Sequence, residues 1–221
     1  MGDDIATRLA RLDACAISDA LDQLGLPPSV TGLGPRAARA RISGSIITVK
    51  LAAGKPPEGA PPRHLCTMAI DMAEPGQVIV VEQRTGIECA GWGGILSNAA
   101  RGRGLSGVIV EGLVRDVDEA LDIGFPVYAR GSTARTARGR IHEVATGYPI
   151  QVGDIVVSTG DWVVADGSGT AFVPADWIKD VLAAAERIAA REACMTKAVL
   201  AGNPVSIVMG GDYEHLLETT E

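Results

Sequence analysis

Glycine is the residue that most constrains how this chain can fold. It occupies 27 of 221 positions and recurs every few residues between positions 86 and 112. Because glycine has no Cβ atom, this density indicates tight turns, or places where the backbone closely approaches another group. The glycines separate short apolar runs, so the sequence predicts strands and helices that alternate over short distances.

The hydrophobic pattern predicts a mixed α/β fold. Apolar residues spaced three or four apart predict an N-terminal helix over about residues 4–25 and a long C-terminal helix over about 175–201. A β-rich core is expected over about 42–174. Within it, the predicted strands are 42–50, 77–83, 107–111 and 126–130, and the predicted helices are 64–73, 95–102 and 116–123. No repeat or long linker divides the chain, so residues 1–221 are expected to form a single domain.

Composition and charge exclude several classes of function. The chain has 27 acidic and 20 basic residues, a formal net charge of −7, and only 3 Trp, 3 Tyr and 2 Phe. A chain with no run of Lys or Arg and few aromatic residues is not expected to bind nucleic acid. No apolar stretch is long enough to span a bilayer, and the N-terminus lacks the apolar region of a signal peptide. We therefore expect a cytoplasmic protein with no membrane partner.

The cysteines and histidines argue against a zinc-type centre. The four cysteines are widely spaced and form no C-x-x-C motif, so buried thiols are expected rather than disulfides or zinc ligands. The three histidines form no H-x-x-x-H pair. His142 and Glu143 are neighbours on a predicted strand, where adjacent side chains point to opposite faces and are not expected to act together. A bound metal is therefore expected to be a hard cation held by oxygen, such as Mg²⁺ or Mn²⁺.

Two glycine motifs have different contexts. Residues 102–107 match G-x-G-x-x-G, but a predicted helix precedes them and a strand follows, which is the reverse of a dinucleotide-binding motif. They are better explained as a helix C-terminus and a turn. Residues 91–94 (GWGG) precede a helix that starts near Ile95. The free N–H groups of such a helix start can bind a carboxylate or phosphate, although a turn without a ligand explains the motif equally well.

Arg115 and Asp116 follow a predicted buried strand and open a helix. In one interpretation, Asp116 caps that helix in a capping box with Glu119. In the other, a guanidinium and a carboxylate lie together at the carboxyl end of a strand, where α/β proteins tend to bind ligands. Arginine can hold a carboxylate through two hydrogen bonds, and aspartate can hold Mg²⁺.

The segments WGGILSNAARGRGLSGVIVEGLVRD and GFPVYARG resemble the RraA-like family, and weaker similarity extends over about residues 5–200. This family includes the regulator of ribonuclease E activity and metal-dependent 4-hydroxy-4-methyl-2-oxoglutarate aldolases. Some members were formerly described as demethylmenaquinone methyltransferases. A methyltransferase is not expected here, because no glycine loop lies between a first strand and its helix to hold the methyl donor.

The resemblance implies a three-layer α/β/β sandwich of the swivelling-domain type with a long C-terminal helix. It also implies a homotrimer, or a hexamer built as a dimer of trimers, with active sites between subunits and the C-terminal helix packed on a neighbouring subunit. Arg115 would bind the pyruvyl unit of a small-molecule 2-oxo acid, and Asp116 would hold Mg²⁺ or Mn²⁺. The resemblance places the substrate carboxylate on the backbone of the glycine turn and the helix after it, at Gly93, Gly94, Ile95 and Leu96. It assigns Glu192 of a neighbouring subunit to support the metal.

The sequence departs from the family aldolases at Gly94. Those aldolases carry an acidic residue directly after the turn glycine, where it helps to position the water that takes the substrate hydroxyl proton. The regulators lack this acid too, but they also lack the Arg-Asp pair. Losing a general base should impair aldol cleavage more than decarboxylation of oxaloacetate, which requires no proton transfer.

The leading hypothesis is therefore a metal-dependent carbon–carbon lyase that acts through a pyruvate enolate. Its activity would be decarboxylation of oxaloacetate, aldol cleavage of the 4-hydroxy-4-methyl-2-oxoglutarate type, or both. The alternative is a non-catalytic regulatory or binding protein.

Overall fold

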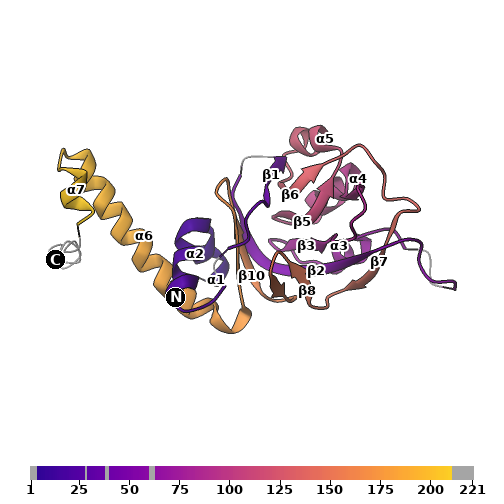
Figure 1. Ribbon diagram of the computed structural model, residues 1–221, viewed down its shortest axis with the longest axis horizontal. Helices are drawn as coiled ribbons and strands as arrows, with labels where there is room; N and C mark the ends of the chain where they lie inside the picture. Colours follow the sequence, from indigo (N-terminus) through magenta and orange to yellow (C-terminus); the bar gives the residue numbers. More distant parts are fainter. Residues whose placement is uncertain (1–3, 28, 38–39, 60–62, 211–221) are drawn as a thin grey trace.

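A curled β-sheet with short helices against it is joined to a long C-terminal helix that runs away from the sheet (Figure 1). The computed structural model describes residues 4–27, 29–37, 40–59 and 63–210. The helices are α1 Ile5–Ala10, α2 Ala14–Gln23, α3 Thr67–Met72, α4 Gly94–Gly102, α5 Val117–Asp122, the 3-10 turn η1 Ala175–Trp177, α6 Ile178–Leu200 and α7 Val205–Val208. The strands are β1 Gly34–Ala37, β2 Ile42–Ala53, β3 Val78–Glu82, β4 Ala90–Trp92, β5 Gly107–Val114, β6 Val127–Ser132, β7 Ile141–Thr146, β8 Ile150–Val152, β9 Ile155–Val157, β10 Trp162–Ala165 and β11 Thr170–Val173.

The centre of the sheet is parallel and apolar on both faces. β3 lies between β2 and β5 and pairs with each in parallel register, and β6 pairs in parallel with β5. Because successive strand residues face opposite ways, Ile79 and Val81 pack in the core under α3, α4 and α5, whereas Val78 and Val80 pack in the core on the other face. This double burial explains the continuous apolar runs of the sequence.

The long strand β2 pairs with different strands along its length. Its first residues, Ile42 to Ser45, pair antiparallel with β10. Its later residues pair in parallel with β3 and antiparallel with β7. The β10–β11 hairpin continues from β2, and the β8–β9 hairpin packs in the core on the face away from α3, α4 and α5. The fold is therefore mixed α/β with a curled sheet and a long C-terminal helix, as the resemblance implied.

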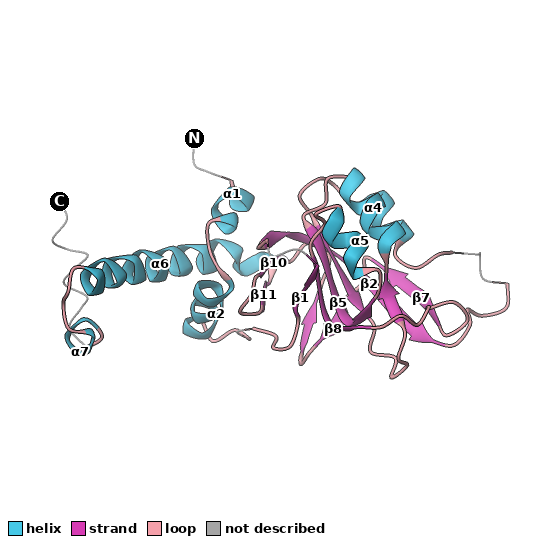
Figure 2. Cartoon of the chain, turned by 90° about the horizontal axis from the view of Figure 1, so that it is seen from above, coloured by secondary structure: helices cyan, strands magenta, loops and turns pink. Residues whose placement is uncertain are grey.

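A third apolar cluster joins the two ends of the chain. Side chains of α1, α2 and the first turns of α6 pack on the outer face of β10 and β11. Figure 2 shows α1 and α2 beside α6, away from α4 and α5. A bidentate ion pair fastens this arrangement: Nε and Nη2 of Arg8 each lie 2.7 Å from a carboxylate oxygen of Glu186. These hydrogen bonds from Arg8 keep the pKa of Glu186 below its usual value.

The single N-terminal helix predicted over residues 4–25 is wrong, because the structure contains two helices there. The chain breaks after α1, and Asp13 starts α2 by accepting a hydrogen bond from the Ala16 N–H at 2.8 Å. Asp166 accepts the Ala14 N–H at 2.9 Å, which fixes the same helix start to the β10–β11 turn. Apolar spacing continues across the break, so it could not reveal this cap. The predicted C-terminal helix over about 175–201 is confirmed as η1 and α6.

In the described part of the chain, no helix is long and apolar enough to cross a membrane.

Gly44 on β2 provides a test of the packing between β2 and the turn before β3. A Cβ atom at position 44 would collide with the Gly76 carbonyl oxygen, which belongs to the backbone and cannot rotate away. We expect Gly44→Ala to lower the free energy of unfolding by about 1–3 kcal/mol in urea denaturation, as overpacking does elsewhere. Gly34→Ala on β1 is the control, because a Cβ there meets nothing within 4 Å. Equal unfolding midpoints for the two variants would contradict this packing.

Candidate functional site

Parallel pairing brings the glycine turn and the Arg-Asp pair together. β4 pairs in parallel with the end of β5, with Trp92 opposite Val114. The Arg115 N–H then donates to the Trp92 carbonyl at 3.0 Å. The carboxyl ends of the two strands therefore meet at one edge of the sheet, with Gly93 and Gly94 beside Arg115 and Asp116.

Asp116 stands at the start of α5 but caps α4. Its backbone adopts the left-handed conformation, with φ of 56°, which aspartate tolerates better than most residues. Its Oδ2 accepts hydrogen bonds from the Gly94 N–H at 2.9 Å and from Arg115 Nε at 3.2 Å. The expected capping box is therefore wrong, because the Asp116 side chain makes no capping hydrogen bond to α5.

The two glycines of the turn leave room for two carboxylates of the α5 segment. A Cβ at Gly93 would lie 2.8 Å from Asp116 Oδ2, and a Cβ at Gly94 would collide with Glu119 Oε2. Glycine at both positions therefore lets two carboxylates of the α5 segment lie directly against the start of α4.

Trp92 anchors the turn from below. Its side chain is buried, and its ring stacks with Phe125 at a centroid distance of 6.4 Å. Its Nε1 donates to Ser97 Oγ at 2.9 Å, and that hydroxyl donates to the Gly93 carbonyl at 3.3 Å. These contacts fix the backbone of the turn relative to the core.

A cavity of about 660 Å³ opens over this turn. The six residues that the sequence indicated on this chain for substrate and metal all line it: Gly93, Gly94, Ile95, Leu96, Arg115 and Asp116. The Ile95 side chain is 84% exposed, which is unusual for an isoleucine and leaves it open to a ligand or a partner. The structure thus brings together two motifs that lie about twenty residues apart in the sequence.

The opposite wall of the cavity is organised by Glu143, which the sequence did not indicate as a site residue. Its side chain is only 1% exposed and lies 3.4 Å from Arg63. It accepts hydrogen bonds from the Cys66 N–H at 2.6 Å and from Thr146 Oγ1 at 2.7 Å. Its neighbour His142 instead lies 3.2 Å from the Gly54 carbonyl, so the two adjacent side chains have separate contacts, as expected.

The N–H groups at the start of α4 that could bind an anion are those that follow Gly94. The first N–H groups of a helix have no acceptor within the helix and carry the positive end of its dipole. Gly94 already donates its N–H to Asp116. An incoming carboxylate would therefore meet the N–H groups of Ile95 and Leu96, together with Arg115.

Asp116 is the side chain of this cavity best suited to hold a hard cation. Its Oδ2 has two donors, while its Oδ1 has no hydrogen-bond donor within the described residues, and the side chain is 38% exposed. Those residues contain no group of three or more His, Cys, Asp or Glu side chains that could enclose a metal. Mg²⁺ commonly binds through one or two carboxylates while retaining several waters, so a single open carboxylate beside a substrate site fits Mg²⁺ better than zinc.

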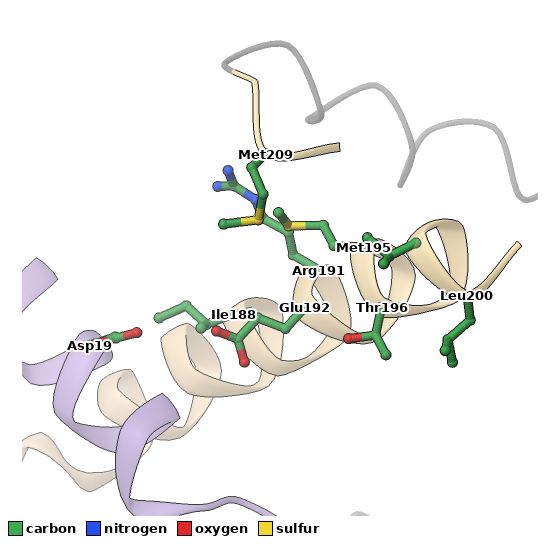
Figure 3. A pocket seen from close by; sticks show the side chains of 9 residues that line it. Asp19, Ile188, Arg191, Glu192, Met195, Thr196, Leu200 and Met209 are labelled. Atoms are coloured by element: carbon green, nitrogen blue, oxygen red, sulfur yellow. The ribbon is translucent and has the colours of Figure 1, made fainter. Parts of the chain in front are cut away.

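Glu192 lies away from this cavity in the same chain. It is on α6, where it lines a second hollow of about 640 Å³ with Asp19, Ile188, Arg191, Met195 and others (Figure 3). Within one chain the structure therefore does not bring Glu192 to Arg115 and Asp116. Its assignment to a neighbouring subunit's site stays a prediction.

Comparison with known proteins identifies the family. The family model described as RraA-like, Aldolase/RraA, matches residues 14–171. The chain therefore belongs to the RraA-like family. A protein of Halalkalibacterium halodurans named "Putative 4-hydroxy-4-methyl-2-oxoglutarate aldolase" is 27% identical over 201 residues, which cover 89% of each chain. Its name supports an aldolase-like role at the level of the family.

Two further similarities extend over most of the chain. The protein DlpA of Legionella pneumophila is 25% identical over 179 residues, or 81% of this chain, but that match spans only 29% of DlpA. A crystal structure of an uncharacterized protein from Pseudomonas syringae superposes with a TM-score of 0.82 at 26% identity, covering 93% of this chain and 96% of the other. The fold, long helix included, is therefore shared with a solved structure.

The burial of the Cys66 thiol beside the cavity can be tested by chemical labelling. Its side chain is fully buried, its backbone has a φ of 63°, and its Sγ lies 3.8 Å from the Gly91 carbonyl. Burial, and then the Glu143 charge, raise the pKa of the Cys66 thiol well above its usual value. Because only the thiolate reacts, iodoacetamide at pH 8 should label the exposed Cys15 and leave Cys66 unlabelled until the protein is unfolded. Mass spectrometry of the peptides checks this, and equal labelling of the two cysteines in folded protein would contradict it.

Proposed function

We propose that this protein is a divalent-metal-dependent lyase that acts on a 2-oxo acid through a pyruvate enolate. The observation that carries the proposal is the convergence of Arg115, Asp116 and the start of α4 at one end of a cavity. The activity is decarboxylation of oxaloacetate, aldol cleavage of 4-hydroxy-4-methyl-2-oxoglutarate, or both. Relatives named as aldolases support the second reaction at the family level.

Arg115 is oriented for this task by Asp116. Its Nε is held by the Asp116 carboxylate at 3.2 Å, and its two terminal nitrogens have no hydrogen-bond partner within the described residues. A guanidinium held in this way can present its terminal N–H groups to a carboxylate or to a developing enolate oxygen. The N–H groups of Ile95 and Leu96 lie at the same end of the cavity and would orient the acid group of the substrate.

The open oxygen of Asp116 would hold Mg²⁺ or Mn²⁺, which would supply a Lewis acid for the carbonyl of the 2-oxo acid. Arg115 adds a fixed positive charge in the same place. A preorganised charge of this kind stabilises the transition state more than the ground state, because negative charge builds up on the carbonyl oxygen only as the bond breaks.

The two candidate reactions make different demands on the chain. In decarboxylation of oxaloacetate, the bond between C3 and the departing carboxylate breaks and its electrons form the enolate. In aldol cleavage, the hydroxyl on C4 must also lose its proton. Arg115 and Asp116 are sufficient for the first demand, whereas the second also requires a proton acceptor.

The first test measures pyruvate release from oxaloacetate with Mg²⁺, with EDTA, and after subtraction of the metal-only background. We expect EDTA to abolish turnover, and Arg115→Ala and Asp116→Ala each to lower kcat/KM by about 10²–10³-fold, as loss of one transition-state donor does elsewhere. Asp118→Ala is the matched control, because Asp118 lies in the first turn of α5 and is exposed. Unchanged activity in Arg115→Ala, or chelator-insensitive turnover, would contradict the proposal. Absence of turnover would favour a non-catalytic binding protein.

We also propose that the outer part of α6 packs on a neighbouring subunit in a trimer or hexamer. All buried residues of α6 lie in its first eight positions, between Ile178 and Ala185. Beyond them, Ile188, Met195, Val199 and Leu200 line the open hollow of Figure 3, and Leu200 is 82% exposed. An apolar helix face of this length is more stable when a partner covers it. Packing of this kind would allow Glu192 to reach a cavity that it cannot reach in its own chain.

Sedimentation velocity tests this assembly. We expect a species of three or six times the chain mass of 22.8 kDa. Val199→Asp should shift it to monomer, because it places a charge in the apolar hollow, whereas Lys197→Ala on the same helix should not. A wild-type protein that is monomeric at assay concentration and still fully active would contradict both the assembly and the role of Glu192.

A further inference from the structure

The cavity over the glycine turn carries more positive charge than its own carboxylates balance. Its charged lining residues are three arginines and two acids: Arg63, Arg115, Arg138, Asp116 and Glu143. Asp116 is paired with Arg115 at 3.2 Å. Glu143 is paired with Arg63 at 3.4 Å. The guanidinium of Arg138 is therefore left over in a chain of net charge −7, and a surplus of this sign favours a ligand with more than one negative charge.

Arg138, an exposed residue of the loop between β6 and β7, is available to such a ligand. Its backbone N–H donates to Thr136 Oγ1 at 3.3 Å, but its guanidinium has no hydrogen bond or ion pair within the described residues. In the same loop, Arg135 is paired with Glu88 at 2.7 Å. Arg140 donates to the Thr136 carbonyl at 3.0 Å. Arg138 therefore keeps its side-chain donors open for a carboxylate, which a guanidinium can hold through two hydrogen bonds.

Two histidines line the cavity on the wall that Glu143 organises. They are His64, which lies between two residues that contact Glu143, and His142, its neighbour on β7. The Nδ1 of His64 lies 3.2 Å from the Leu65 carbonyl, and that of His142 lies 3.2 Å from the Gly54 carbonyl. In the part of the chain that the structure describes, neither Nε2 has a partner. A free ring nitrogen can form a hydrogen bond with an acid group, so this wall offers further polar contacts.

The strand order separates this wall from Arg115. β4 pairs with β5 on the side where β3 ends, because β6 occupies the other side of β5. β2 lies beside β3, and β7 lies beside β2. Arg115 follows β5 and Arg138 precedes β7, so three strand spacings, on the order of 14 Å, separate the two segments along the sheet. A three-carbon pyruvyl unit, with bonds of about 1.5 Å, spans well under half of that distance.

We propose that the substrate of this site is an extended 2-oxo acid with a second carboxylate at its far end, which Arg138 binds. The inference rests on the proposed lyase function and names its substrate class. The pyruvyl end lies at Arg115 and the far carboxylate at Arg138. The chain between them lies against the apolar part of the lining, which includes Leu65, Trp92 and Ile141. Such an acid is longer than 4-hydroxy-4-methyl-2-oxoglutarate, whose two carboxylates end a five-carbon chain.

Calorimetry with two seven-carbon acids in the presence of Mg²⁺ tests this assignment. 2-Oxoheptanedioate and 2-oxoheptanoate share the pyruvyl end and differ only at the far end, where the first has a carboxylate and the second a methyl group. We expect the dicarboxylate to bind wild-type protein at least about tenfold more tightly, as one hydrogen bond between charged groups allows. The gain of 2-oxoglutarate over 2-oxopentanoate should be smaller, because the shorter chain does not reach Arg138.

Substitutions of Arg138 separate this contact from a general attraction of charge. In Arg138→Ala the two seven-carbon acids should bind within about twofold of each other. In Arg138→Glu the dicarboxylate should bind more weakly than the monocarboxylate, because like charges repel. Binding of the monocarboxylate reports whether the rest of the site is intact. Arg140→Ala is the matched control, because it removes the same charge from the same loop, and Arg140 does not line the cavity.

The outcomes separate the inference from the proposed function. Equal affinity of wild-type protein for the two seven-carbon acids overturns the inference, and so does an advantage of the dicarboxylate that survives in Arg138→Ala. A larger gain for the five-carbon pair also overturns it, since the second carboxylate would then bind near the pyruvyl end. These results leave the lyase proposal standing, because turnover of oxaloacetate decides that proposal. If the protein has no turnover and binds none of the four acids, both fail together.

Discussion

The arrangement of the candidate site depends on one hydrogen bond, from the Gly94 N–H to Asp116 Oδ2. It links the start of α4 to the start of α5, and it forms only because parallel pairing of β4 with β5 ends both strands at the same edge. Asp116 makes it from a left-handed backbone conformation, and glycine at position 93 leaves room for the carboxylate, since a Cβ there would lie 2.8 Å from Asp116 Oδ2. The same carboxylate oxygen accepts a hydrogen bond from Arg115 Nε. Asp116 therefore fixes the guanidinium of Arg115 as well as its own negative charge at this end of the cavity.

The charges at this end are arranged in a way that suits a small acidic ligand. Asp116 and Glu119 lie against the positive end of α4, and Arg115 lies beside them, so the carboxylates are partly balanced before any ligand binds. Among the residues that the structure describes, the N–H groups of Ile95 and Leu96 have no acceptor. On the far wall, Glu143 is buried and saturated with donors, which makes it a structural rather than a reactive acid. The cavity therefore has one end with charged groups that can meet a ligand and one wall whose carboxylate is already hydrogen-bonded.

The sequence predicted the parts of this protein that depend on local pattern. The β3 and β5 strands, the long α6 helix and the Arg115-Asp116 pair each leave a periodic or motif signature, and the structure has them where the pattern indicates. The break between α1 and α2 left none, because the apolar spacing continues through it. The contact of Glu119 with Gly94 and Asn98 joins helices about twenty residues apart, so neither residue alone could reveal it. The proposed role of Glu192 would require a second chain, so it cannot be derived from a single chain.

The most direct measurement of the central claim is calorimetric binding of oxalate, a stable mimic of the pyruvate enolate in shape and charge. The account predicts that oxalate binds wild-type protein in the presence of Mg²⁺ and that binding is lost in EDTA, in Asp116→Ala and in Arg115→Ala. Binding that is unchanged by EDTA and by both substitutions would show that the anion lies elsewhere, and that the convergence of Arg115, Asp116 and the start of α4 has another purpose.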